Sequence, residues 1–191
     1  MSRFRQEADD RIVDLAAGLF ARHGFENTSL RALADAVGLS KAGLLHHFPS
    51  KEALHEAVQA ACRDLEREVA DAAAPLPPGP DRDRHNLELL IDVALDRPGL
   101  VALALTAIHG GQPLPEGGLG EVILREAFGV EREPAGREPA DPERTIRVIG
   151  ALTALAVLTL LANGAGQKTA WRPHILSTCF DALGHRAPVE A

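Results

Sequence analysis

The chain has 191 residues, of which 46% are apolar and 25% are charged. These fractions are close to those of ordinary globular proteins, so wholesale disorder is excluded. Lys and Arg number 20 against 27 Asp and Glu, which gives a formal net charge of −7. That balance excludes a uniformly basic nucleic-acid coat and a polybasic membrane anchor, and it leaves open a local basic face.

Two cysteines, Cys62 and Cys179, are too few for a disulfide framework or a four-cysteine zinc site. We expect both to be buried small hydrophobes in a reducing compartment. The N-terminal residues lack the apolar core of a signal peptide. The longest apolar stretch, Val148–Ala162, is shorter than the roughly 20 residues of a membrane span. We therefore expect a cytoplasmic protein that does not enter a membrane.

Four helices are predicted in the first 75 residues. Apolar residues recur at helical spacing from Ile12 to Phe20, and Gly24 should end that helix because glycine accepts left-handed backbone. Ser or Thr before the second helix, and Ser40 and Ser50 before the third and fourth, have the side chains that cap helix N-termini. The first expected helix ends at residue 23. The other three are expected over residues 30–37, 40–48 and 50–73.

Five further helices are predicted beyond the Pro-rich stretch at 75–80. Pro98 suits the first turn of a helix that is apolar almost all round, which predicts that this helix is buried. Asp141 and Pro142 are an N-cap followed by proline at the first helical position. Segments 110–118 and 131–142 are expected to be loops. The helices are expected over 87–95, 98–108, 119–128, 141–163 and 172–184. No run shows strand alternation, so the predicted fold is all-α with about nine helices.

Residues 28–49 predict a helix-turn-helix. Two short amphipathic helices meet at Gly38, which permits the unusual backbone of the turn. Ala34 is small where the helices would cross, and Leu44 fills the space between them. The second helix of such a pair can lie in the major groove of DNA. The alternative is a helical corner in a protein–protein adaptor that binds no DNA.

The sequence around this corner resembles the N-terminal domain of TetR-family transcription regulators. The resemblance lies in residues 12–58, in Gly24-Phe25, Thr28-Ser29, the string 37–41 (VGLSK) and the string 46–54 (HHFPSKEAL). It covers about a quarter of the chain. The rest matches the family only in length, helical content and number of helices.

The resemblance implies a homodimeric regulator that binds a (pseudo)palindromic DNA operator, more often as a repressor, and is released when a small molecule binds. It implies a DNA-binding domain over 1–49 and a ligand-binding and dimerisation domain over 50–191. By this resemblance, residues 41–48 form the recognition helix and residues 50–73 the connecting helix. The two C-terminal helices, 141–163 and 172–184, form the dimer interface.

This chain departs from the family pattern at two positions of the recognition helix. The family commonly has a polar residue at the position of Gly43 and an aromatic one, usually Tyr, at that of Leu45. The chain contains no Tyr at all. Gly43 also weakens the helix by about 1 kcal/mol relative to Ala.

Cations and caps supply the expected DNA contacts. Lys41 is expected to reach a base edge or a phosphate. Lys51 lies at a helix start, where a cation opposes the helix dipole, so its placement suggests a phosphate partner. Ser and Thr caps with adjacent backbone N–H groups can also bind phosphate. An alternative for each is a solvated or purely capping side chain.

His46 and His47 are adjacent and do not share a helix face, so no metal site is expected there or elsewhere. His47 is expected to touch DNA, and His46 to pack or hydrogen-bond locally. The full set of expected DNA-binding residues is Thr28, Ser29, Arg31, Ser40, Lys41, Ala42, Gly43, Leu45, His46, His47 and Lys51.

A ligand pocket is expected in the C-terminal part, lined by Leu103, Thr106, His109 and Phe128. The alternatives are that His109 bonds carbonyls of its own helix end and that Phe128 fills the core. No Gly-rich phosphate loop follows a strand and no Gly-x-Ser-x-Gly elbow occurs, so we expect neither an enzyme nor a cofactor.

The acidity is unevenly distributed. Residues 1–51 carry seven Lys or Arg and six Asp or Glu, for +1, whereas residues 52–191 carry thirteen against twenty-one, for −8. The N-terminal segment therefore has to rely on individually placed cations, helix N-termini and dimer geometry to bind DNA, and its non-specific binding should be weak at physiological salt.

Overall fold

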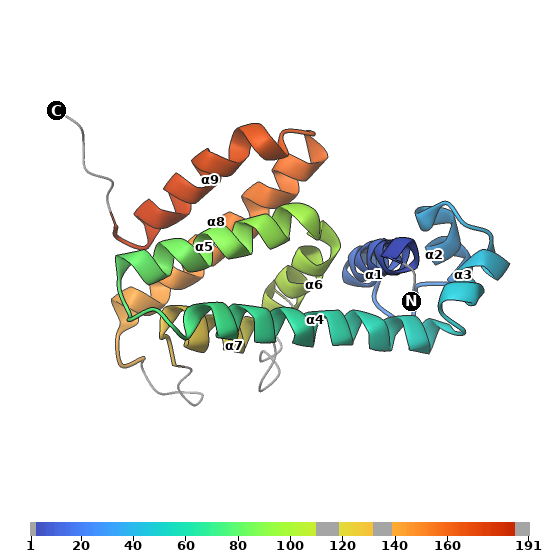
Figure 1. Ribbon diagram of the computed structural model, residues 1–191, viewed down its shortest axis with the longest axis horizontal. Coiled ribbons are helices and arrows are strands. Elements are labelled where there is room, and N and C mark those ends of the chain that lie inside the picture. The colour runs from blue at the N-terminus through green and yellow to red at the C-terminus, as the bar shows by residue number, and fades with distance from the viewer. Residues whose placement is uncertain (1–2, 110–118, 132–138, 186–191) are drawn as a thin grey trace. The chain divides into compact units, whose positions relative to one another are not determined.

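The computed structural model of this chain describes residues 3–109, 119–131 and 139–185. Those residues form helices and connecting turns without a strand, which confirms the predicted all-α fold (Figure 1). The predicted loop at 110–118 and most of that at 131–142 lie outside the described residues. The elements are α1 (Arg3–His23), α2 (Leu30–Val37), α3 (Lys41–His47), α4 (Lys51–Ala73), α5 (Pro80–Asp96), α6 (Pro98–His109), α7 (Leu119–Val122), the π-helix η1 (Ile123–Ala127), α8 (Pro142–Gly164) and α9 (Lys168–Ala182).

The chain divides into two compact units. Unit 1 comprises Met1–Asp64 with Arg97–Gln112, and unit 2 comprises Leu65–Asp96 with Pro113–Ala191. Compactness therefore groups α6 and the first half of α4 with α1, α2 and α3. The expected functional boundary between residues 49 and 50 is a different kind of division, and it stays a prediction.

Helix ends in unit 1 follow the local signals. Gly24 (φ +78°) and Gly38 (φ +73°) have the left-handed backbone that the sequence predicted for them. The N–H groups of Gly38 and Leu39 close the end of α2 by donating to carbonyls of its last turn. Behind these ends lies an apolar core made by Ile12, Val13, Ala16, Ala17, Phe20, Leu33, Ala34, Leu44, Leu54, Val58 and Leu100.

Helix α6 packs closely against α1. A side chain at Gly99 would place its Cβ 1.8 Å from the carbonyl oxygen of Asp14, so only glycine fits. The Asp14 carboxylate also accepts a hydrogen bond of 3.0 Å from the N–H of Leu100, in the first turn of α6. The expectation that α6 is buried on all sides is wrong for its described residues. Leu100 is buried, but residues 101–105 are half-buried, because within unit 1 the main neighbour of α6 is α1.

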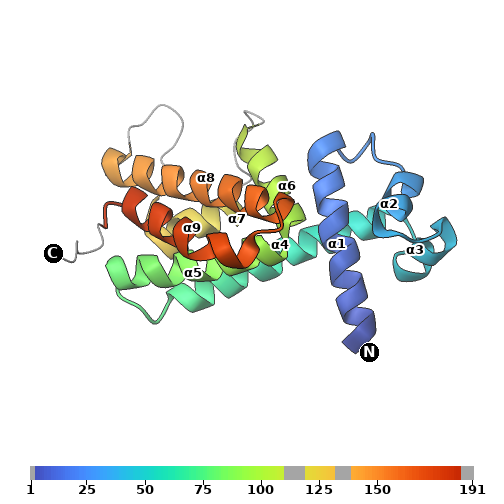
Figure 2. The same cartoon turned by 90° about the horizontal axis from the view of Figure 1, so that it is seen from above.

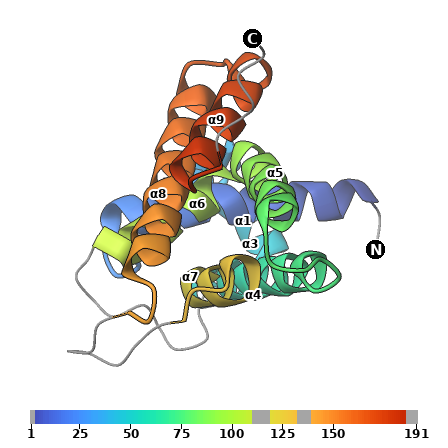
Figure 3. The same ribbon diagram turned by 90° about the vertical axis from the view of Figure 1, so that its left-hand side faces the viewer.

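Unit 2 is built around α5, α8 and α9, which lie side by side (Figures 2 and 3). Helix α8 begins where predicted, with the Asp141 carboxylate accepting from the N–H of Arg144 at 2.9 Å. Cys179 of α9 is fully buried, and burial raises the pKa of its thiol to about 11, whereas Cys62 in unit 1 is half-buried. The expected burial is therefore confirmed for Cys179, whereas Cys62 is buried only in part.

A buried acidic side chain ties three parts of unit 2 together. Asp83 of α5 is 3% exposed, and its carboxylate accepts from Nη2 of Arg144 in α8 at 2.8 Å. The other carboxylate oxygen lies 2.7 Å from Nε2 of His185, just beyond α9. One carboxylate therefore connects α5, α8 and the end of α9.

The same region contains the π-helix η1. The sequence predicts an α-helix over 119–128, and this is wrong for the second half of that segment. Its last carbonyls are held by side chains remote in sequence, which local periodicity does not reveal. The Glu126 carbonyl accepts from Arg82, the Ala127 carbonyl from Asn86 and the Phe128 carbonyl from Arg144.

Helix α8 has 23 residues and is long and apolar enough to cross a membrane by length and composition alone. The core helix of a soluble protein meets the same criterion. One side of α8 packs into unit 2 through Val148, Ala151, Leu155, Ala156, Thr159 and Ala162.

Candidate nucleic-acid interface

Helices α2 and α3 form the predicted helix-turn-helix within unit 1 (Figure 1). Ala34 is 1% exposed and Leu44 is fully buried, so both lie in the core beneath the corner, as the sequence predicts. Gly38 provides the left-handed turn between the helices. Burial of one side of each short helix fixes their relative orientation and leaves the other side of α3 at the surface.

The outer face of α3 carries a lysine, a histidine and small or apolar residues. Lys41, Ala42 and His46 are exposed, and Gly43 and Leu45 are partly exposed. The Ser40 hydroxyl caps α3 by accepting from the N–H of Gly43 at 3.0 Å. These residues were all predicted from the sequence, and the structure gathers them on one short helix.

Of the two hydroxyl residues before α2, Ser29 is confirmed as the cap. Ser29 accepts from the N–H of Ala32 at 3.1 Å and is exposed at the start of α2. Thr28 is different, because it is 3% exposed and its hydroxyl donates to the Gly24 carbonyl at 2.7 Å. Thr28 thus holds the turn between α1 and α2, and we leave it out of the interface.

Lys51 is engaged within the protein. Its Nζ donates to the Phe25 carbonyl at 3.0 Å and lies 4.1 Å from the centre of the Phe25 ring. The amine has further N–H groups for a phosphate, so the predicted DNA contact stays a prediction. Arg31 extends from α2 with its side chain 88% exposed, at 3.9 Å from Asp35. So exposed a pair contributes little to stability and leaves the guanidinium available to a ligand.

Contacts from α1 hold the end of α3, and sequence reasoning missed them. Nδ1 of His47 lies 2.5 Å from an Asp9 carboxylate oxygen, and both side chains are 20% exposed. Arg5 donates to the His46 carbonyl at 3.4 Å. His47 therefore positions α3 against α1, and its other ring nitrogen is the atom left for the predicted DNA contact. Periodicity gives no signal for pairs 38 or 41 residues apart.

The start of α4 is a well-capped helix end. The Ser50 hydroxyl accepts from the N–H of Ala53 at 3.1 Å. Hydrogen bonds from the backbone of Glu52 itself, and then from Ser50, lower the pKa of the Glu52 carboxyl. The carboxylate is thus favoured in the first turn, where the helix dipole stabilises an anion.

The expected pocket residues fall in different places. Leu103 packs against the core of unit 1, and the Thr106 hydroxyl bonds the Ala102 carbonyl at 2.9 Å. The side chain of His109 lies outside the described residues. Phe128 is 4% exposed in unit 2, as its core alternative requires. The pocket stays a prediction.

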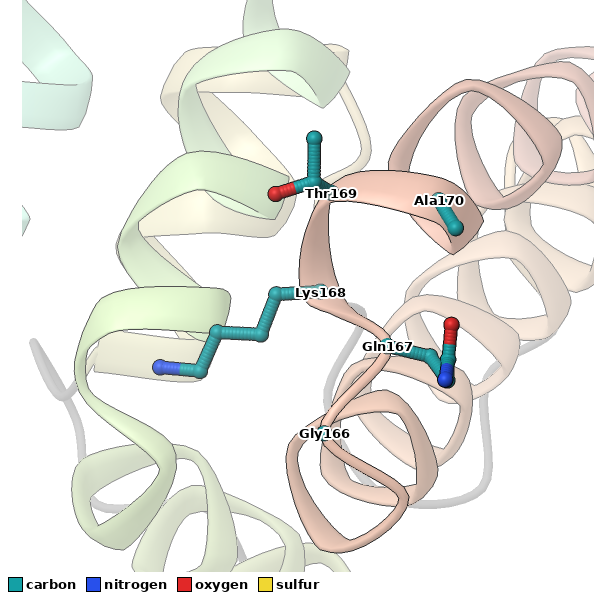
Figure 4. A pocket seen from close by; sticks show the side chains of 5 residues that line it. All are labelled: Gly166, Gln167, Lys168, Thr169 and Ala170. Carbon is teal, nitrogen blue, oxygen red and sulfur yellow. The ribbon is translucent and has the colours of Figure 1, made fainter.

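A different hollow is seen in unit 2, at the turn between α8 and α9 (Figure 4). It is an open depression of about 420 Å³ lined by residues 166–170. Lys168 lies along it and donates from Nζ to the Leu95 carbonyl at 2.6 Å. Among the described residues, no three His, Cys, Asp or Glu side chains are grouped to hold a metal ion.

Sequence comparison matches this interface to known proteins. The profile of the bacterial regulatory proteins of the tetR family matches residues 12–58. The biofilm operon icaADBC HTH-type negative transcriptional regulator IcaR of Staphylococcus aureus (strain Newman) is 38% identical over 55 residues, which are 29% of this chain and 30% of IcaR. The HTH-type transcriptional repressor KstR2 of Rhodococcus jostii (strain RHA1) is 46% identical over 43 residues, 22% of this chain and 21% of KstR2. The matches thus span less than a third of each relative.

Structural comparison extends the likeness to the whole fold. The gamma-butyrolactone receptor (ArpA-like protein) has a TM-score of 0.52 at 17% identity, covering 93% of this chain and 98% of the receptor. The fatty acid degradation regulator FadR from Bacillus halodurans has a TM-score of 0.50 at 14% identity, covering 94% and 97%. At these identities the comparison concerns the fold alone.

An N-terminal helix-turn-helix joined to a larger helical domain defines the class of all-α helix-turn-helix proteins. Within that class, residues 12–58 of this chain match the tetR family of bacterial regulatory proteins. The relatives that match this segment, IcaR and KstR2, are named as transcriptional regulators.

Proposed function

We propose that this protein is a ligand-responsive transcriptional repressor that binds a (pseudo)palindromic DNA operator as a dimer. The observation that carries the proposal is α3, a short helix with one buried side and an outer face that exposes a lysine, a histidine and small residues. Such a helix fits the major groove, while α2 crosses the backbone. The similar proteins IcaR and KstR2 are named as a negative transcriptional regulator and a repressor, which supports the proposal that this protein represses transcription. The adaptor alternative has no comparable support.

The proposed phosphate contacts come from both helices of the motif. Ser29 and Arg31 at the start of α2 and Ser40 at the start of α3 are exposed, and Lys41 in the first turn of α3 can reach a phosphate or a base edge. Lys51 lies at the first turn of α4. Each cation that neutralises a phosphate steepens the salt dependence of binding by about one unit of slope.

Operator selection from random duplexes, followed by fluorescence anisotropy at several salt concentrations, tests DNA binding. We expect one enriched sequence with two related half-sites. Lys51→Ala should weaken binding to every sequence and flatten the salt slope by about one unit, and Lys41→Ala should weaken binding to the selected operator and flatten the slope as well. Arg84→Ala, which removes an exposed cation from α5, is the control and should leave both quantities unchanged. A folded protein that enriches no sequence at low salt contradicts the proposal.

Dimerisation is proposed through α8 and α9. The exposed large apolar side chains of the described residues are Ile146, Ile149, Val157, Leu161 and Trp171, four of them on α8. Exposed Gly150 lies among them and permits close helix approach, whereas Ala151 faces the core of unit 2. An apolar surface of this kind indicates a protein partner, and a second copy would cover it.

Light scattering at micromolar concentration tests the dimer. The unaltered chain should have twice the mass of a monomer, and Val157→Glu with Leu161→Glu should give a folded monomer. Because unpaired charges in an apolar interface are costly, each substitution should act strongly. A monomeric unaltered chain contradicts this part of the proposal.

A small molecule bound by the C-terminal part is proposed to release the operator, and the cytoplasm is the proposed location. Both rest on the family resemblance, and Leu103, Thr106, His109 and Phe128 stay the proposed lining. Screening compounds for raised melting temperature and for loss of operator binding tests the response, since a ligand of the native state stabilises it by mass action.

A further inference from the structure

The exposed polar side chains of α3 are an amine and an imidazole, and the remaining groups are apolar. Residues 41–47 read KAGLLHH, without a carboxylate or a carboxamide. Leu44 is buried, and His47 is paired through Nδ1 with Asp9. What faces outward is the Lys41 amine, the His46 imidazole, the Ala42 methyl group and the half-exposed Leu45 side chain.

These groups are spaced as two rows on one helix. Lys41 and Leu45 are separated by four residues, as are Ala42 and His46, so each pair lies one helical turn apart on adjacent rows. Each row thus combines a nitrogen-bearing side chain with an apolar one. Gly43 flanks the Ala42–His46 row on the side away from Lys41 and adds no side chain.

The fold does not require glycine at position 43. A Cβ there would lie 3.4 Å from Oγ of Ser40 and 3.7 Å from Cβ of Leu39, which are ordinary van der Waals contacts. Gly43 nevertheless weakens a helix relative to Ala. Its effect at the surface is to let the α3 backbone come closer to a partner than any other residue would.

The major groove presents distinct groups for such a surface. Guanine offers the acceptors N7 and O6, and thymine offers its 5-methyl group. Adenine is usually recognised by a bidentate Asn or Gln, and the cytosine amino group usually donates to an Asp or Glu. Helix α3 has neither kind of side chain.

We infer that α3 reads its operator half-site through guanine acceptors, bound by Lys41 and His46, and thymine methyl groups, packed against Ala42 and Leu45. Gly43 sets the close approach that brings these short side chains to the bases. This inference rests on the proposed function and names the base chemistry by which it is specific.

Base analogues in the selected operator test it. Replacing thymine by deoxyuridine removes only the methyl group, and replacing guanine by 7-deazaguanine removes only the N7 acceptor. We expect deoxyuridine at one or more half-site positions to weaken binding about fourfold, as for loss of one buried methyl group. Leu45→Ala should abolish that sensitivity at its position. 7-Deazaguanine should weaken binding at another position, and Lys41→Met should abolish that effect.

Controls separate base contact from folding and from DNA binding itself. Leu89→Ala, at a half-exposed leucine of α5, should retain the full deoxyuridine effect, and circular dichroism melts check that each variant folds. Unchanged affinity for fully deoxyuridine-substituted and 7-deazaguanine-substituted operators overturns the inference while DNA binding stands. Binding to no sequence at all overturns the proposed function and this inference with it.

Discussion

The two compact units differ in what they bury and in what they expose. Among the described residues, unit 1 buries one polar side chain, Thr28, beneath its helix ends, whereas unit 2 buries three, Asp83, Asn86 and Thr159. The polarity of their surfaces shows the opposite trend. Helix α3 of unit 1 exposes a lysine amine and an imidazole, whereas α8 of unit 2 exposes large apolar side chains. Unit 1 thus depends on close apolar packing and suits a charged partner. Unit 2 depends on internal polar pairing and suits an apolar one.

The largest expected effect breaks the polar pairing of unit 2. Asp83→Ala removes the carboxylate that Arg144 and His185 share, and leaves a partly buried guanidinium without its partner. We expect a loss of about 3 kcal/mol in the free energy of unfolding, measured in urea. Asp181→Ala, at an exposed carboxylate of α9, should cost less than 0.5 kcal/mol or so. Equal effects of the two changes would remove the distinction between the units.

The next largest effect concerns the packing of α6 against α1 in unit 1. Substitutions on the two sides of this helix crossing should change the free energy of unfolding in opposite directions. Gly99→Ala forces a Cβ against the Asp14 carbonyl and should destabilise by about 2 kcal/mol. Gly18→Ala places its Cβ 3.5 Å from Cα of Gly99, an ordinary contact, and should stabilise by up to about 1 kcal/mol. Urea unfolding of both variants measures the contrast, and two changes of the same sign would contradict the described crossing.

A smaller effect separates stability from function in α3. Gly43→Ala should raise the free energy of unfolding by about 1 kcal/mol, because the site accommodates a Cβ and alanine favours the helix. The same change should weaken operator binding, because it holds the backbone away from the bases. Thermal melts and fluorescence anisotropy titrations on one preparation measure the change in stability and the change in operator affinity. Tighter binding would mean that α3 gains more from helix stability than from close approach.

The smallest expected effect on stability concerns the exposed ion pair between Asp92 of α5 and Arg172 of α9. Hydrogen bonding by Arg172 lowers the pKa of the Asp92 carboxyl. The stability it contributes is therefore present above the ordinary Asp pKa and is lost as the pH falls through the lowered value. Asp92→Asn should cost about 0.5 kcal/mol at pH 7, since half-exposed pairs are screened. Melting curves at pH 7 and pH 3 should show this difference shrinking with acid, and a constant difference would contradict the ion-pair explanation.

The sequence determined the helices and the corner between α2 and α3. Left-handed glycines, serine caps and the Asp141–Pro142 start act within a few residues, so they are readable from the chain alone. The same local rules placed Ala34, Gly38 and Leu44 correctly and predicted the candidate residues of α3. The restricted base chemistry of α3 also follows from its side chains.

Tertiary structure alone decided which of these side chains is available. It buries Thr28 on the Gly24 carbonyl, sets Lys51 over Phe25 and pairs His47 with Asp9. It also attaches α6 to α1 and converts the segment after α7 into a π-helix. Except for the bond between Thr28 and Gly24, these outcomes depend on groups brought together from positions tens of residues apart. Hydrogen bonding or steric fit between such groups leaves no periodic trace in the sequence.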